Sequence, residues 1–93
     1  MKVFFSKKAE IGLEKIFEHV IQNFNQEQAQ KIRDELVSSI LKIGEFPELG
    51  TKIAAQADKR VLYVAGNAII YEIVLRADPI IVIRNIRPRR SKV

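Results

Sequence analysis

Cysteine is absent from this sequence of 93 residues, and histidine occurs once, as His19. The absence of cysteine excludes a disulfide framework, a thiolate metal site and a cysteine nucleophile. One histidine leaves too few ligands for a zinc site, and a lone histidine on a helix is usually a surface or half-buried side chain. The sequence has no glycine-rich phosphate loop. The one candidate, Gly66 with Asn67, has the pattern of a turn. We therefore expect neither a metal nor a cofactor.

Long apolar runs are also missing. Nothing in the sequence approaches the length of a membrane span, and the first residues, MKVFFSKKAE, lack the apolar core of a signal peptide. The composition, with 47% hydrophobic and 29% charged residues, is that of an ordinary globular protein. We expect a cytoplasmic protein with no membrane partner, folded as a single domain over residues 1–93.

Acidic residues are scarce in the second half of the chain. Residues 1–58 carry eight Lys and Arg against nine Asp and Glu, a net charge of −1, whereas residues 59–93 carry eight against two, a net charge of +6. Such asymmetry favours a polyanionic partner, although it also serves solubility. The cations cluster in residues 79–92, PIIVIRNIRPRRSK, where a β-branched strand leads directly into Arg84, Arg87, Arg89 and Arg90. These four arginines are the candidate target-binding residues.

Two amphipathic helices are predicted after a short strand at residues 2–5. Ser6 is a good N-cap for the first helix, which should end near residues 23–25, and Asn25 with Gln28 has capping-box spacing for the second. Gly44 is predicted to end the second helix. The apolar stripes, which we expect to form core, are Ala9, Leu13, Ile16, Phe17, Val20, Ile21 and Phe24, then Ala29, Ile32, Leu36, Val37, Ile40 and Ile43.

Strand patterns dominate the second half. After the loop EFPELG, in which Phe46 and Leu49 are expected to pin the chain, residues 51–58 fit a loop or a weak strand. Residues 60–65, 68–75 and 80–86 predict three strands, with Gly66 and Asn67 as a two-residue turn. Their short connections imply an antiparallel meander. The predicted fold is α+β, in the order β-α-α-β-β-β, with a helical hairpin packed on an antiparallel sheet.

Arginine and tyrosine are the side chains left for chemistry. Alternation along the last strand predicts that Arg84 shares a face with Val82 and Ile86. The other face is then expected to carry Ile81, Ile83, Asn85, Arg87 and Arg89. Metal-free RNA cleavage can run on cations that stabilise the phosphorane and on a tyrosine or lysine that moves protons. The candidates for such a nuclease are Lys59, Arg60, Tyr71, Arg84 and Arg87, with Tyr63 as a further proton carrier; alternatively, both tyrosines only pack as β-formers.

Four segments resemble the RelE/ParE superfamily of toxins from bacterial type II toxin–antitoxin modules. They are VFFSKKAEIGLEKI, FPELG, AIIYEI and the terminal Ile-Arg-x-Ile-x-x-Arg-Arg. The resemblance spans essentially the whole chain. It implies the β-α-α-β-β-β fold and a cognate antitoxin, whose acidic segment we expect to wrap the toxin in a hetero-oligomer, as in plasmid-stabilisation modules.

The resemblance leaves two mechanisms. The RelE branch cuts mRNA on the ribosome, whereas the ParE branch inhibits DNA gyrase. This chain has Ala68 where the RelE pattern has an arginine, Val61 and Leu62 where it has lysines, and Arg87 where many members have a histidine. No tyrosine follows Tyr71. The resemblance therefore favours a ParE-like gyrase inhibitor that is not an enzyme; the alternatives are a ribosome-dependent mRNA endoribonuclease or a basic adaptor domain without toxicity.

Overall fold

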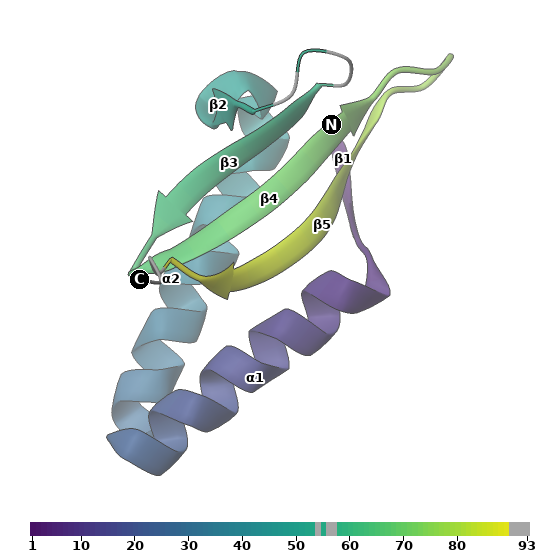
Figure 1. Ribbon diagram of the computed structural model, residues 1–93. Coiled ribbons are helices and arrows are strands. Elements are labelled where there is room, and N and C mark those ends of the chain that lie inside the picture. Colours follow the sequence, from purple (N-terminus) through teal and green to yellow (C-terminus); the bar gives the residue numbers. More distant parts are fainter. Residues whose placement is uncertain (54, 56–57, 90–93) are drawn as a thin grey trace.

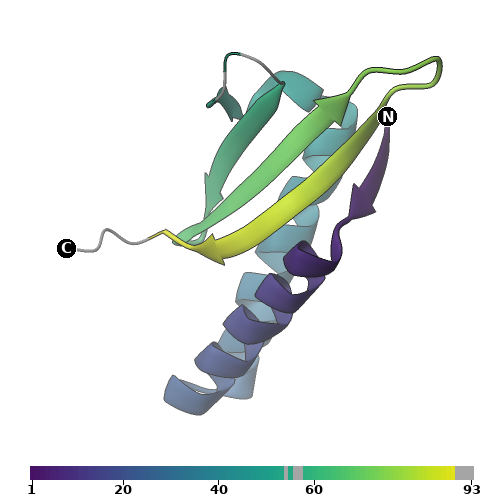
Figure 2. The same cartoon turned by 45° about the vertical axis from the view of Figure 1, so that its right-hand side comes forward.

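The computed structural model describes residues 1–53, 55 and 58–89, and it contains two helices on one face of a five-stranded sheet (Figure 1). The elements are β1 (Lys2–Phe5), α1 (Lys7–Asn23), α2 (Gln26–Glu45), the 3-10 turn η1 (Pro47–Leu49), β2 (Thr51–Lys52), β3 (Lys59–Val64), β4 (Asn67–Val74) and β5 (Ile80–Pro88). The predicted α+β class and the β-α-α-β-β-β order are confirmed. The other face of the sheet is not covered by either helix (Figure 2).

The sheet is mixed and not antiparallel throughout as predicted, with the strand order β1-β5-β4-β3-β2. Strands β3, β4 and β5 form the predicted antiparallel meander. Strand β1 joins it in parallel, with Lys2 opposite Ile80 and Phe5 opposite Ile83. A parallel neighbour needs a long crossover, and here that crossover is most of the chain, which is why it could not be recognised from short turns. The segment after Gly50, which the sequence predicts as a loop or a weak strand, contributes the two-residue strand β2.

Both helices begin where the sequence predicts. The Ser6 side chain accepts a hydrogen bond from the Ala9 amide at 3.1 Å, and the Asn25 side chain accepts one from the Gln28 amide at 2.7 Å. The predicted stop at Gly44 is wrong, because α2 continues to Glu45. A residue before proline avoids helical backbone, and Phe46, which precedes Pro47, has non-helical angles of φ −130° and ψ 81°, so the helix ends there. The carbonyl of Gly44 instead accepts a hydrogen bond from the Met1 amino group at 3.0 Å.

The helical stripes form the core only where the helices lie over the sheet. Ala9, Ile16, Val20, Ala29, Leu36, Ile40 and Ile43 are buried as predicted, and they pack against buried residues of β4 and β5. Leu13, Phe17 and Ile32 are partly buried. Ile21 is exposed and Phe24 is 70% exposed, because the connection between the helices projects beyond the edge of the sheet (Figure 1). Val37, in the second half of α2, is exposed as well. Phe46 and Leu49 are also exposed, so they do not pin the EFPELG loop.

The hairpin between β3 and β4 turns one residue earlier than predicted. Val64 pairs with Asn67, so the two loop residues are Ala65 and Gly66, with φ angles of 52° and 75°. Two consecutive positive φ angles are the mark of a type I′ turn, which matches the twist of the strands. Asn67 begins β4 instead, and its buried side chain donates to the Ala65 carbonyl at 3.0 Å.

Candidate functional site

A β-bulge in β5 decides which arginines share a face. Tyr71 pairs with Ile83 but Ile70 pairs with Asn85, so Arg84 is an extra residue without a partner on β4. An extra residue reverses the alternation beyond it. Ile86 therefore lies on the covered face with the core, and the prediction that it shares a face with Arg84 is wrong. Arg87 moves to the uncovered face opposite Ala68 and is separated from Ile81 and Ile83.

We call the uncovered side of β3, β4 and β5 the open face. Its residues include Lys59, Val61, Tyr63, Ala68, Ile70, Glu72, Arg84, Arg87 and Arg89. One row across the three strands is Tyr63, Ala68 and Arg87, with the smallest side chain in the middle. The small side chain leaves a recess of about 280 Å³ lined by Ile53, Val61, Tyr63, Ala68, Ile70, Arg87 and Arg89.

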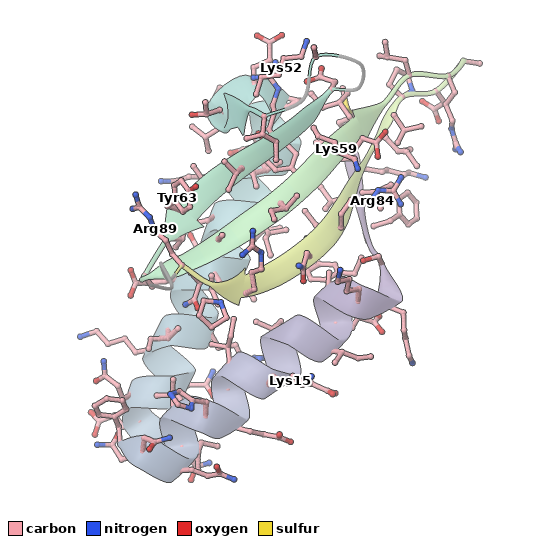
Figure 3. All side chains as sticks on the ribbon, in the orientation of Figure 1. Lys15, Lys52, Lys59, Tyr63, Arg84 and Arg89 are labelled. Atoms are coloured by element: carbon pink, nitrogen blue, oxygen red, sulfur yellow. The ribbon has the colours of Figure 1, made fainter. Side chains whose placement is uncertain are left out.

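Arg89 is held against Tyr63 at one end of the open face. Its guanidinium carbon lies 4.0 Å from the centre of the Tyr63 ring, a cation–π geometry, and its amide donates to the Gly66 carbonyl at 2.9 Å. Figure 3 shows the two side chains next to each other at the end of β3. A planar cation stacked on a ring loses little freedom when it binds an anion. Arg89 is therefore pre-organised.

The other end of the open face is partly neutralised. The Arg84 guanidinium donates to the Glu72 carboxylate at 2.9 and 3.0 Å, and Lys59 lies directly opposite Glu72 in the register. Lys59 and Arg84 are labelled in Figure 3. Within the described part of the chain, Arg87 and Arg89 have no acidic partner. The unpaired positive charge of the open face is therefore concentrated near Tyr63.

Tyr71 and Arg60 lie on the covered face. The Tyr71 side chain is fully buried; its hydroxyl accepts a hydrogen bond from the Gly50 amide and donates one to the Pro47 carbonyl, both at 2.7 Å. Burial raises the pKa of the Tyr71 hydroxyl above its ordinary value. The Arg60 guanidinium donates to the Asp58 carboxylate at 2.8 Å and to the Gly50 carbonyl at 3.0 Å. Both side chains hold the EFPELG loop against the sheet.

The five candidate nuclease residues are therefore not brought together. Lys59, Arg84 and Arg87 lie on the open face, whereas Arg60 and Tyr71 lie on the covered face. The two sets are separated by the sheet itself. Of the four target-binding candidates, the structure places Arg84, Arg87 and Arg89 on the open face, and Arg90 lies outside the described residues.

A cationic groove lies between α1 and the end of β5. It has a volume of about 650 Å³ and is lined by Lys8, Ile11, Gly12, Lys15, Ile16, His19, Val20, Ile32, Ala65, Asn67, Asn85, Ile86, Arg87 and Pro88. The lining contains three lysines or arginines and no acidic residue. Lys15 is labelled in Figure 3. Strand β1 pairs with β5 only as far as Ile83. The residues of β5 beyond Ile83 therefore have no neighbouring strand on that edge, and they line the groove.

Sequence reasoning missed this groove, although a signal was present. Lys8 and Lys15 are seven residues apart, which places them on the same side of a helix. Glu10, Glu14 and Glu18 line a different hollow, beside Arg33 of α2. Helix α1 therefore has a basic side toward β5 and an acidic side toward α2. His19 is exposed, as predicted, and the Asn23 side chain donates to its carbonyl at 2.8 Å.

Neither helix of the described chain is both long and apolar enough to cross a bilayer. Among the same residues, no group of three or more His, Asp or Glu side chains is placed to hold a metal ion.

Comparison with known proteins places these features in a family. A family model described as the ParE toxin of type II toxin–antitoxin system, parDE, matches residues 3–93. No curated protein matches the chain. Among solved structures, the fold is similar to a chain of the chromosomal ParDE TA system from P. aeruginosa, with a TM-score of 0.79, 17% sequence identity and 97% of each chain covered. At that identity, the likeness concerns the fold alone.

Proposed function

The chain belongs to the ParE toxin family of type II toxin–antitoxin systems, and from this premise we propose that it inhibits DNA gyrase and is neutralised by a cognate antitoxin. In this proposal the protein acts in the cytoplasm, forms a hetero-oligomer with the antitoxin and performs no chemical step of its own.

The observation that carries the proposal is the position of Tyr71. A ribonuclease of this fold needs a proton carrier beside the cations that stabilise the transition state. The Tyr71 hydroxyl is buried, uses its proton for the Pro47 carbonyl, and lies on the opposite side of the sheet from Arg84 and Arg87. Inhibition by binding needs no proton transfer, so this arrangement supports the gyrase branch over the nuclease branch.

The target-binding residues in this proposal are Arg84, Arg87, Arg89 and Arg90. Arg87 and Arg89 are exposed and have no acidic partner among the described residues, so both guanidinium groups are available to an anionic surface. Arg84 is partly occupied by Glu72 and is expected to contribute less. Arg90 is included among the target-binding residues from the sequence alone.

The antitoxin is expected to bind the cationic groove with an acidic, amphipathic segment. The groove combines apolar residues such as Ile11 and Ile16 with the charges of Lys8, Lys15 and Arg87. Such a lining fits a helix with one apolar face and acidic flanks. Because Arg87 also belongs to the open face, an antitoxin seated here would cover part of the target-binding surface.

The test is to add the purified chain to gyrase, ATP and relaxed plasmid, and to express it in cells without the antitoxin. We expect loss of supercoiling in vitro, and in cells replication arrest and a DNA-damage response with intact mRNA. Cleavage of ribosome-bound mRNA with normal gyrase activity would overturn the proposal in favour of the nuclease. Full activity of gyrase together with intact mRNA would favour the adaptor without toxicity.

Paired variants make the same assay specific for the arginines. Arg89→Ala with Arg90→Ala should relieve inhibition. Arg76→Ala with Lys31→Ala removes the same charge from exposed positions outside the open face and should leave inhibition unchanged. Equal effects of the two pairs would show that net charge alone matters. A cognate antitoxin, co-expressed with the chain in cells, should relieve the replication arrest.

A further inference from the structure

We propose that the open face binds single-stranded DNA directly, through phosphate contacts from Arg87 and Arg89 and stacking of a base at Tyr63. This inference rests on the proposed function and deepens it, because it assigns the target-binding arginines to the DNA of the gyrase–DNA complex. It goes beyond a general affinity for anions, since it names an aromatic contact and a strand preference.

The charges of the open face suit a phosphate backbone. The described part of this face carries four cations, Lys59, Arg84, Arg87 and Arg89, against one acid, Glu72, and that acid is already paired with Arg84. Arg87 and Arg89 keep their donors free of acidic partners in the described chain. Arginine matches phosphate because its planar fork donates two parallel hydrogen bonds.

Tyr63 adds a feature that simple charge attraction does not require. Its side chain is on the open face and is 50% exposed, so part of the ring is accessible to a ligand. The Arg89 guanidinium covers one side of the ring at 4.0 Å. Unpaired bases stack on tyrosine rings and on arginine planes, so this pair offers either surface to a base.

The recess beside Tyr63 gives the base a place to lie. It has a volume of about 280 Å³, and its floor contains Ala68, which is opposite both Tyr63 and Arg87 in the register. Lys59 lies four residues before Tyr63 on the same strand, a distance of about 13 Å at the usual rise. Phosphates of neighbouring nucleotides can therefore reach cations at both ends of the face.

The stacking contact distinguishes a single strand from a duplex. In a duplex the bases are stacked on each other, so a ring on a sheet cannot reach their planes without opening the helix. The cations alone would hold either form through the backbone. If the open face is built for an unpaired strand, Tyr63 should therefore contribute more to binding a single strand than to binding a duplex.

The experiment measures fluorescence anisotropy of a labelled 12-nucleotide oligothymidylate with the purified full chain, between 50 and 200 mM salt. We expect salt-dependent binding that is tighter for the single strand than for a duplex of equal length. Arg87→Gln with Arg89→Gln should weaken binding about 25-fold at 0.1 M salt and lower the salt slope by about 1.4, as expected for two lost phosphate contacts on a single strand. Tyr63→Leu should weaken single-strand binding about fivefold or more. It should weaken duplex binding less, because a duplex loses only the support that the Tyr63 ring gives to Arg89.

The matched control is Arg76→Gln with Lys31→Gln, which lowers the net charge equally at exposed positions away from the open face. Circular dichroism of every variant verifies the fold. The inference is overturned if the control pair weakens binding as much as the arginine pair, if duplex binds as tightly as single strand, or if no oligonucleotide binds. RNA of matched sequence binding in place of DNA would also overturn it.

The outcomes separate this inference from the proposed function. Gyrase inhibition by the wild-type chain without oligonucleotide binding would leave the proposed function intact and remove the DNA contact. Oligonucleotide binding that depends on Tyr63, without any effect on gyrase, would support the DNA-binding site and contradict gyrase as the target.

Discussion

The Tyr71 hydroxyl accepts a hydrogen bond from the Gly50 amide at 2.7 Å and so ties the centre of the sheet to the loop after α2. The approach is possible because residue 50 has no side chain: a Cβ there would lie 2.8 Å from the hydroxyl oxygen. Gly50 has extended backbone, so its need for glycine comes from space and not from its φ angle. The FPELG and AIIYEI segments therefore contact each other through Gly50 and Tyr71.

The first prediction tests this contact with Tyr71→Phe. The substitution keeps the ring but leaves the Gly50 amide and the Pro47 carbonyl without their partner, which should lower the free energy of unfolding by about 1–3 kcal/mol. Urea denaturation measures the change. Tyr63→Phe is the control, because the Tyr63 side chain is half exposed, and its effect should stay within about 0.5 kcal/mol. Equal stability of the two variants would contradict a structural role for the Tyr71 hydroxyl.

The second prediction follows from the raised pKa of Tyr71. The folded state favours the neutral Tyr71 hydroxyl, because burial raises its pKa. The contribution of this hydroxyl to the free energy of unfolding is therefore fully present below the ordinary tyrosine pKa of about 10, and it is lost as the pH rises through the raised pKa. The wild-type chain should therefore lose more stability than Tyr71→Phe between about pH 9 and pH 11. Parallel stability curves for the two proteins over that range would show that Tyr71 does not titrate differently on folding.

The third prediction concerns the contact of α1 with β5. A Cβ on Gly12 would lie 2.1 Å from the carbonyl oxygen of Ile86, and backbone atoms cannot move aside as a side chain can. Gly12→Ala should lower the melting temperature and cost at least about 1–3 kcal/mol, the usual range for overpacking. Gly44→Ala is the matched control in α2, where the nearest atom is the Val3 Cγ2 at 3.2 Å. A Gly12→Ala protein as stable as the control would mean that α1 does not approach β5 this closely.

Local features were predictable because their causes are local. The caps at Ser6 and Asn25 and the buried parts of both stripes depend on nearby residues and on helical periodicity, and the structure confirms them. The exposure of Phe24 could not be read from periodicity, because it depends on how far the helices extend beyond the sheet. The parallel pairing of β1 joins the two ends of the chain and has no local signal.

The candidate site was predictable only in composition. The sequence shows that the cations gather near the end of the chain, and the structure places Arg84, Arg87 and Arg89 on one face. Which residues share that face depends on the bulge at Arg84, and a bulge arises from pairing with another strand. The stacking of Arg89 on Tyr63 likewise joins residues 26 positions apart in sequence (89 minus 63) and could not be found from spacing.

The fourth prediction uses the turn between β3 and β4. Ala65 has a φ angle of 52°, a left-handed conformation that costs a residue with a Cβ about 1–2 kcal/mol. Asparagine tolerates this conformation, and Asn-Gly is the favoured pair in a type I′ turn. Ala65→Asn should raise the free energy of unfolding by about 0.5–1 kcal/mol, whereas the β-branched Ala65→Val should lower it. Thermal denaturation that ranks the three proteins otherwise would place the turn at other residues.

The fifth prediction separates structural from functional arginines. Arg60 is mostly buried and bonded to Asp58 and the Gly50 carbonyl, so Arg60→Ala should cost about 1–3 kcal/mol of stability, and any loss of gyrase inhibition should follow the folded fraction. Arg87 is exposed and has no acidic partner in the described chain, so Arg87→Ala should keep the melting temperature and weaken inhibition. Melting curves and inhibition of supercoiling, measured on the same preparations, give both quantities. If both arginines belonged to one nuclease site, Arg60→Ala and Arg87→Ala would each abolish mRNA cleavage without loss of stability. That result would contradict the placement of Arg60 and Arg87 on opposite faces of the sheet.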